Sequence, residues 1–111
     1  MRILRHSTAV FANGELEKNF NSMDENDEIK IYLKRAIQDI QNNAFCGIQL
    51  PKRLIPREYA KKYRITNLWK YDIPDGWRLI YSITTPNKIE IISVILEWFN
   101  HKNYERKFGY R

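Results

Sequence analysis

The stretch IEIISVILEWF, residues 89–99, is the feature that most constrains what this chain can fold into. It is rich in β-branched residues and ends in two aromatic residues, a composition typical of a strand buried at the centre of a sheet. Two further segments of this kind come before it, each followed by a turn signal: Leu68–Asp72 before Pro74-Asp75-Gly76, and Trp77–Thr84 before Pro86-Asn87. The short turns predict an antiparallel sheet, and Arg2–Val10 is predicted to add an edge strand.

The first half of the chain predicts two helices. In residues 13–23, NGELEKNFNSM, apolar side chains recur at helical spacing and Asn13 is a suitable N-cap. Residues 29–40 carry a stronger apolar stripe, with acidic residues before it and Asn42-Asn43 at its end. Because few residues separate the helices, they should form a hairpin. We predict one α+β domain over residues 1–111, a helical hairpin packed on a small twisted antiparallel sheet in the order β-α-α-β-β-β.

The net charge of +6 is concentrated in one segment. Residues 51–71 hold seven Lys or Arg against Glu58 alone, interleaved with aromatic residues. Such a segment suits RNA binding, although a solvated basic face would have the same composition. Residues 47–66 form a long connector, with a short helix predicted from Pro56 through Tyr63. The candidate RNA-binding residues are Lys52, Arg53, Arg57, Lys61, Lys62, Arg64 and Arg106.

Composition also argues against several classes of protein. The single cysteine, Cys46, excludes an internal disulfide, and two histidines far apart in the sequence give no metal motif. Apolar stretches are too short for a signal peptide or a bilayer span. We therefore expect a cytoplasmic protein that needs neither a metal nor another cofactor.

The segment GWRLIYSI, residues 76–83, is followed by the aliphatic strand and then by HKNYERKF. This pattern resembles the RelE/ParE superfamily of small toxins over most of the chain. In that family, an aromatic–Arg–aliphatic–aliphatic–Tyr strand precedes a last strand that ends in a His/Arg/Lys cluster with a tyrosine. The matching residues here are Trp77, Arg78, Leu79, Ile80 and Tyr81, followed by His101, Lys102 and Tyr104. The polar C-terminal stretch favours the RelE-like branch, the mRNA interferases of type II toxin–antitoxin systems.

The resemblance implies a metal-independent endoribonuclease that cleaves mRNA on the ribosome and that a small antitoxin neutralises, with a toxin–antitoxin hetero-oligomer as one form that the complex can take. The ribose 2′-hydroxyl attacks the adjacent phosphate, so the site needs cations and groups that move two protons. By the same resemblance Arg78 stabilises the pentavalent phosphate and Lys70 is a second basic residue. His101, Lys102 and Tyr104 form the C-terminal catalytic cluster. Asp72 departs from the family pattern, because some members have a lysine there.

Each of these residues also has a simpler interpretation. Strand alternation predicts that Arg78 and Ile80 lie on an open face of the sheet, where Arg78 could pair with a carboxylate such as Glu90. His101 could be an ordinary surface histidine, and Tyr104 could pack against a neighbouring aromatic ring. Trp69 and Tyr71 could stack on bases, but core packing is favoured. Asp72 and the long connector leave open a non-catalytic module, either a ParE-like gyrase inhibitor or a protein that binds nucleic acid or an antitoxin.

Overall fold

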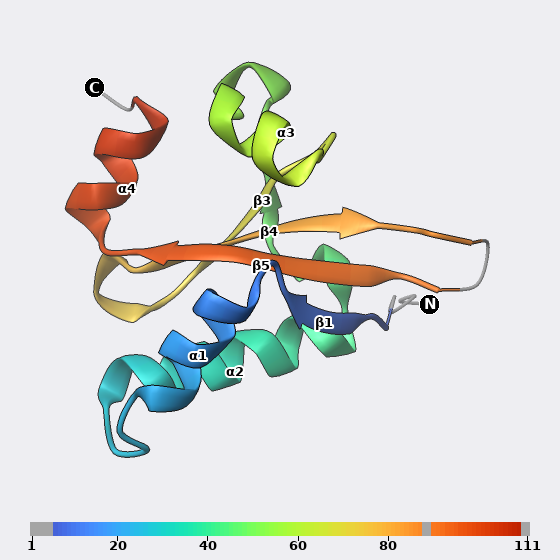
Figure 1. Cartoon of the computed structure of the whole chain (residues 1–111). Helices are drawn as coiled ribbons and strands as arrows, with labels where there is room; N and C mark the ends of the chain where they lie inside the picture. The colour runs from blue at the N-terminus through green and yellow to red at the C-terminus, as the bar shows by residue number, and fades with distance from the viewer. Residues whose placement is uncertain (1–5, 88–89, 110–111) are drawn as a thin grey trace.

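The computed structural model describes residues 6–87 and 90–109 and contains one five-stranded sheet (Figure 1). Its strand order is β1-β5-β4-β3-β2. The strands are β1 (Thr8–Phe11), β2 (Ile48–Gln49), β3 (Trp69–Asp72), β4 (Arg78–Thr84) and β5 (Ile92–Phe99). The predicted buried central strand is confirmed by β5, which pairs with a strand on each side. Ile89 and residues 2–5 of the predicted edge strand lie outside the described residues.

The prediction of a wholly antiparallel sheet is wrong. Strand β1 pairs in parallel with β5, with Thr8 opposite Ile92, whereas the other neighbouring strands are antiparallel. Turns force an antiparallel arrangement only on strands that directly follow one another. Because β1 is far from β5 in the sequence, no turn dictates its direction.

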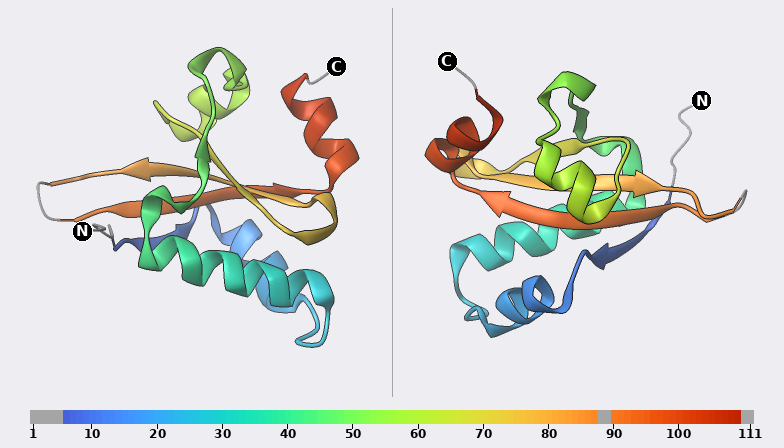
Figure 2. Two further views of the ribbon diagram at one scale, coloured as in Figure 1. Left: turned by 180° about the vertical axis from the view of Figure 1, so that it is seen from behind. Right: turned by 45° about the horizontal axis from the view of Figure 1, so that its top comes forward.

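Helices α1 (Gly14–Ser22) and α2 (Glu28–Asn42) cover one face of the sheet and confirm the predicted hairpin (Figures 1 and 2). Asn13 caps α1 by accepting a hydrogen bond from the Leu16 amide at 2.8 Å. Asp27 caps α2 in the same way, accepting from the Ile29 amide at 2.9 Å. Each cap satisfies an amide that the first turn of a helix leaves unpaired, and so fixes where the helix begins.

The first core lies between this hairpin and the sheet. Its partly buried members include Trp69 and Tyr71, in agreement with the predicted core packing. The Tyr71 hydroxyl also donates a hydrogen bond to Asp39 on α2, and burial together with this bond raises its pKa to about 12. The buried residues of the first core are Phe20, Leu33, Ala36, Ile40, Ile73, Leu79, Tyr81 and Ile95.

The opposite face of the sheet is also covered, so the predicted open face is wrong. The short turn η2 (Lys52–Leu54) and helices α3 (Arg57–Tyr63) and α4 (His101–Phe108) lie over it (Figure 2). Ile80, expected to be open, is buried, and so is Ser82 two residues further along β4. This second core consists of Leu50, Tyr59, Leu68, Ile80, Leu96, Phe99, Tyr104 and Phe108.

The observed order of helices and strands is β1-α1-α2-β2-α3-β3-β4-β5-α4, with short turns η1 (Ala44–Cys46) and η3 (Pro74–Gly76). The predicted order β-α-α-β-β-β is therefore incomplete. It lacks strand β2 and helix α4, and it leaves out helix α3, which was predicted only as a short helix within the connector. The α+β class and the helical hairpin are correct. No helix among residues 6–87 and 90–109 has the length and apolar character needed to cross a membrane.

Candidate functional site

Two of the predicted catalytic residues, Lys70 and Arg78, lie side by side on the α3/α4 face of the sheet. Arg78 is directly opposite Asp72 in the β3–β4 pair, and Lys70 lies two residues before Asp72 on the same face. Oδ1 of Asp72 is 3.0 Å from Nζ of Lys70 and 2.9 Å from Nε of Arg78. One carboxylate therefore bridges two cations, and the three side chains together keep a charge of +1.

Arg78 is held largely out of solvent. Its side chain is 18% exposed, and Nη1 donates a hydrogen bond to the Trp77 carbonyl at 3.2 Å. Nε is fully buried and donates no hydrogen bond to a described residue, because its contact with Asp72 is close without being aligned with the N–H bond. The predicted pairing of Arg78 with Glu90 is wrong. Arg78 begins β4, opposite Phe99, whereas Glu90 precedes β5 at the other end of the sheet.

The ring of Tyr104 covers both cations. Its centroid lies 5.5 Å from Cζ of Arg78 and 6.0 Å from Nζ of Lys70, distances suited to cation–π attraction. Tyr104 is 1% exposed and packs on Phe108, with ring centroids 4.7 Å apart. The ring of Tyr104 is therefore packed against a neighbouring aromatic ring, as its simpler interpretation predicted. A role in proton transfer stays a prediction.

His101 and Lys102 open α4 at the same end of the sheet as Arg78, because Arg78 lies opposite Phe99. The side chain of His101 is 60% exposed, and its Nε2 contacts a carboxylate oxygen of Glu105 one turn further along α4. The helix start is also pressed against the η3 turn, since a Cβ on Gly76 would lie 2.8 Å from Cβ of His101. Lys102 is exposed. These two residues therefore lie at the same end of the sheet as the cation cluster.

The sequence interpretation missed the role of Asp72. It was regarded only as a departure from the family pattern, yet it is the residue that holds Lys70 and Arg78 together. A signal was present, because Asp72 and Arg78 are equally far from Asp75 in the predicted turn. Residues equally far from a hairpin turn are cross-strand neighbours, and opposite charges there attract.

Helices α3 and α4 are joined above the sheet by polar and aromatic contacts. The Tyr59 hydroxyl donates a hydrogen bond to Glu97 of β5, and Lys107 pairs with Glu58. Nζ of Lys107 also lies 5.1 Å from the Tyr59 ring centroid. Burial and the bond to Glu97 raise the pKa of Tyr59, which keeps its hydroxyl protonated at neutral pH. The two helices therefore form one connected layer.

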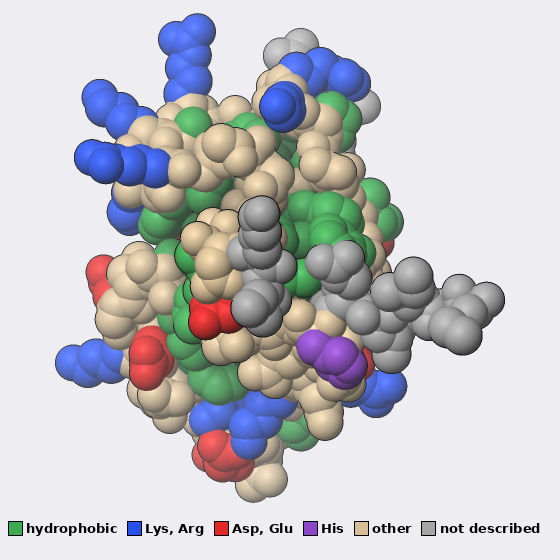
Figure 3. Space-filling model, turned by 90° about the vertical axis from the view of Figure 1, so that its right-hand side faces the viewer, with side chains coloured by type: hydrophobic (Ala, Val, Ile, Leu, Met, Phe, Trp, Pro, Cys, Tyr) green, Lys and Arg blue, Asp and Glu red, His purple; other side chains and the backbone are tan. Residues whose placement is uncertain are grey.

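The predicted RNA-binding residues belong to this same layer. Seen from the side in Figure 3, most Lys and Arg side chains project from the upper part of the molecule, and Asp and Glu lie lower. The structure therefore gathers the basic segment and the cation cluster on one side of the sheet, which the sequence alone did not specify. All seven residues are exposed: Lys52 and Arg53 in η2, Arg57, Lys61 and Lys62 in α3, Arg64 just after α3, and Arg106 in α4.

Within the described part of the chain, no three His, Cys, Asp or Glu side chains are grouped closely enough to hold a metal ion. The chain was compared with protein-family models, with curated proteins and with solved structures, and none of the three comparisons found a match.

Proposed function

We propose that the protein is a metal-independent endoribonuclease of the RelE type, which cleaves mRNA by attack of the ribose 2′-hydroxyl on the adjacent phosphate. The observation that carries this proposal is the packing of Lys70 and Arg78 under one tyrosine ring, on the face that bears the basic segment. Two cations held in place can stabilise a pentavalent phosphate without reorganising during the reaction. The basic layer around them attracts the RNA backbone.

The proposed roles follow from position and chemistry. Arg78 binds the non-bridging phosphate oxygens, because a guanidinium can donate two parallel hydrogen bonds to them. Lys70 adds charge from the neighbouring strand. His101 is exposed at the same end of the sheet as the cluster and serves as the proton-transfer group, since an imidazole ring can both accept and donate a proton. Lys102 supplies further positive charge at the start of α4.

Asp72 has a definite place in this proposal. In the free protein its carboxylate occupies the position between the two cations that a phosphate would take. It is half exposed, so RNA can displace it without opening the core. Asp72 then acts as an internal competitor that lowers affinity for RNA. An antitoxin that neutralises the enzyme in the cytoplasm, and ribosome-bound mRNA as the substrate, belong to the same proposal because the resemblance implies them.

The test is primer extension on a translated message with the full chain and three variants. Arg78→Ala should reduce cleavage about 100-fold or more, the usual loss when one donor to a transition-state oxyanion is removed. His101→Ala should reduce it by a similar factor. Arg35→Ala is the matched control, an exposed arginine on α2 across the sheet, and should cleave normally. Equal cleavage by the Arg78 variant and the parent would mean that the chemistry is assigned to the wrong residues.

A second candidate function is favoured by one observation. Lys70 and Arg78 are both less than one-fifth exposed and share the Asp72 carboxylate, an arrangement that also suits a purely structural ion-pair cluster. The protein would then be a non-catalytic module that binds RNA through its basic layer. Asp72→Asn separates the two functions: a nuclease should cleave faster once its cations are released, whereas a structural cluster should lose thermal stability with no cleavage in any variant.

A further inference from the structure

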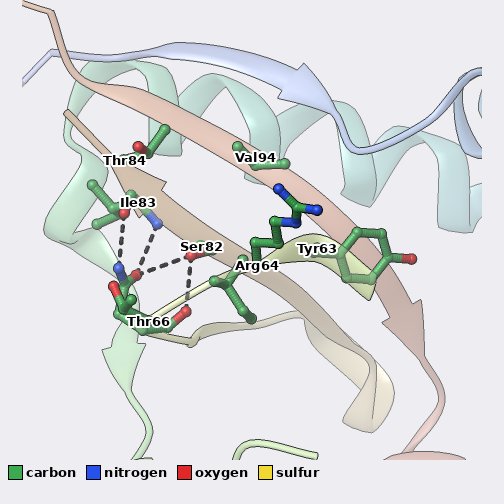
Figure 4. Close-up of a pocket in the computed structure, with 9 residues that line it drawn as sticks. Tyr63, Arg64, Thr66, Ser82, Ile83, Thr84 and Val94 are labelled. Atoms are coloured by element: carbon green, nitrogen blue, oxygen red, sulfur yellow. Dashed lines mark hydrogen bonds between the residues drawn. The ribbon is translucent and has the colours of Figure 1, made fainter. Parts of the chain in front are cut away.

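A pocket of about 190 Å³ lies on the α3/α4 face, away from the cation cluster (Figure 4). It is bounded by the chain that follows α3, by the end of β4 and by Val94 of β5. Ser82 lies in its wall, four residues beyond Arg78 on β4 and on the same face of that strand. At the rise of a strand this separation is about 13 Å. The pocket and the cluster therefore face the same way at two points along one strand.

The wall of the pocket is rigid because its polar groups bind one another. The Asn67 side chain pairs with the backbone of Ile83, accepting from its amide and donating to its carbonyl, both at 2.8 Å. The Ser82 hydroxyl donates to the Asn67 carbonyl at 2.8 Å (Figure 4). The Asn67 amide therefore extends the ladder between β3 and β4 beyond the last backbone pair. A ligand would therefore meet a preformed surface here. Because Asn67 and Ser82 are already hydrogen-bonded, the ligand must find its polar partners among the other residues of the pocket.

Arg64 supplies such a partner. Among the described residues that line the pocket, Arg64 is the only charged one. Its side chain forms no ion pair or hydrogen bond with another described residue. Its backbone is left-handed, with φ at 53°, where glycine is usual at the end of a helix. Figure 4 shows the guanidinium extending over β5 near Val94. The exposed hydroxyls of Thr66 and Thr84 add two donors at the rim.

We infer that this pocket binds a phosphate group of an RNA strand whose scissile phosphate lies at the Lys70/Arg78 cluster. A preformed pocket whose lining offers an available guanidinium and the hydroxyls of two exposed threonines, and contains no carboxylate, selects an anion, and the planar fork of arginine matches phosphate oxygens. This inference rests on the proposed function for the identity of the strand. It singles out Arg64 from a basic segment whose members would otherwise contribute equally.

The experiment measures binding of a fluorescent single-stranded RNA of about ten nucleotides that carries 2′-O-methyl groups and so cannot be cleaved. Arg64→Ala should raise the Kd about tenfold and lower the slope of log K against log salt by about 0.7, the value for one phosphate contact to a single strand. Arg64→Gly keeps the backbone conformation without strain and should bind as weakly as Arg64→Ala, with a melting temperature no lower than the parent.

The matched control is Arg57→Ala, an exposed arginine on α3 that does not line the pocket. It should change the Kd no more than about twofold, an allowance for a general contribution to the positive field. Equal losses for Arg57→Ala and Arg64→Ala would overturn the inference in favour of diffuse binding. Inorganic phosphate is the second arm: if it shifts the Thr66 and Thr84 amide signals in NMR while RNA binds no more tightly than phosphate, assignment to an RNA strand is wrong.

Failure of the inference can be told from failure of the proposed function. If Arg78→Ala abolishes cleavage while both Arg64 variants bind RNA normally, the nuclease assignment stands and the phosphate pocket is rejected. Suppose instead that neither the parent nor any variant cleaves RNA, but that RNA binding depends on Arg64 and not on Arg57. The nuclease assignment then fails, and the pocket stands as the RNA site of a non-catalytic binding module.

Discussion

The two faces of the sheet are built in different ways. Helices α1 and α2 pack on one face with long apolar stripes, and their charges are balanced nearby, as where Glu25 pairs with both Lys30 and Lys34. Helices α3 and α4 are shorter and meet the other face through tyrosine and phenylalanine rings. Most of their cations are exposed and form no ion pair with another described residue. One layer is arranged for stability, and we propose that the other binds an anion.

The largest expected effect is on stability, in the hairpin layer. Leu33 is fully buried on α2, so Leu33→Ala should lower the free energy of unfolding by about 3 kcal/mol through lost burial and the cavity left behind. Chemical denaturation measures this loss. Ile31→Ala on the same helix is the control and should cost well under 1 kcal/mol, because Ile31 is 50% exposed. Similar losses at both positions would contradict the packing described for α2.

RNA binding should depend on one face only. Removing Lys61 and Arg64 from the end of α3 should weaken binding of single-stranded RNA at least tenfold at moderate salt and reduce the salt slope by at least about 0.7. Removing Lys18 and Arg35 from the hairpin changes the net charge by the same amount and should leave both quantities almost unchanged. All four residues are exposed. Fluorescence anisotropy over a salt series checks this, and equal effects from the two pairs would remove the distinction between the faces.

A glycine substitution tests how tightly α4 is seated. Gly76 has φ at +80°, and a Cβ there would meet Cβ of His101 at 2.8 Å, so Gly76→Ala should cost about 1–2 kcal/mol and displace the start of α4. Gly14→Ala at the start of α1 is the control, since a Cβ there meets nothing within 4 Å, and it should be neutral or slightly stabilising. Thermal unfolding and NMR signals of α4 report the two effects.

The smallest expected effect is a pH dependence confined to the hairpin. Hydrogen bonds from Lys30 and Lys34 lower the pKa of Glu25 from 4.5 to about 2. A carboxyl whose pKa is lower in the folded state contributes stability above pH 4.5, and that contribution disappears as the pH falls through about 2. The melting temperature of Glu25→Gln should therefore lie slightly below that of the parent at pH 6 and converge with it near pH 2. A constant difference over this range would show that Glu25 acts through shape alone.

The same division explains what the sequence could predict. Local signals specify the hairpin: Asn13 caps one helix, acidic residues precede the other, and the apolar stripe of α2 repeats every three or four residues. The strands β4 and β5 were predicted because their composition matches their buried position. Strand β2 was missed because it consists of two residues, Ile48 and Gln49, that are extended only through pairing with β3. No local pattern specifies that pairing.

Helix α4 was missed for a different reason. Tyr104 and Phe108 are one turn apart and Asn100 is a suitable cap, so the helical pattern was present, but the segment was interpreted as a cluster of reactive groups. For the site, strand alternation placed Arg78 and Ile80 on one face in advance, whereas Lys70 was included only through the family resemblance. The covering ring of Tyr104 and the bridging carboxylate of Asp72 depend on helix packing and strand register, which a single sequence does not determine.

The parallel pairing of β1 with β5 also has a consequence for how the chain folds. Within the described sheet, β1 has no neighbour except β5, which comes near the end of the chain. During synthesis the hairpin can form early from local contacts, whereas β1 must wait, unpaired, until β5 has left the ribosome. Such long-range closure slows folding and leaves an edge exposed to wrong partners. The last strand to be made is therefore the one that completes the sheet.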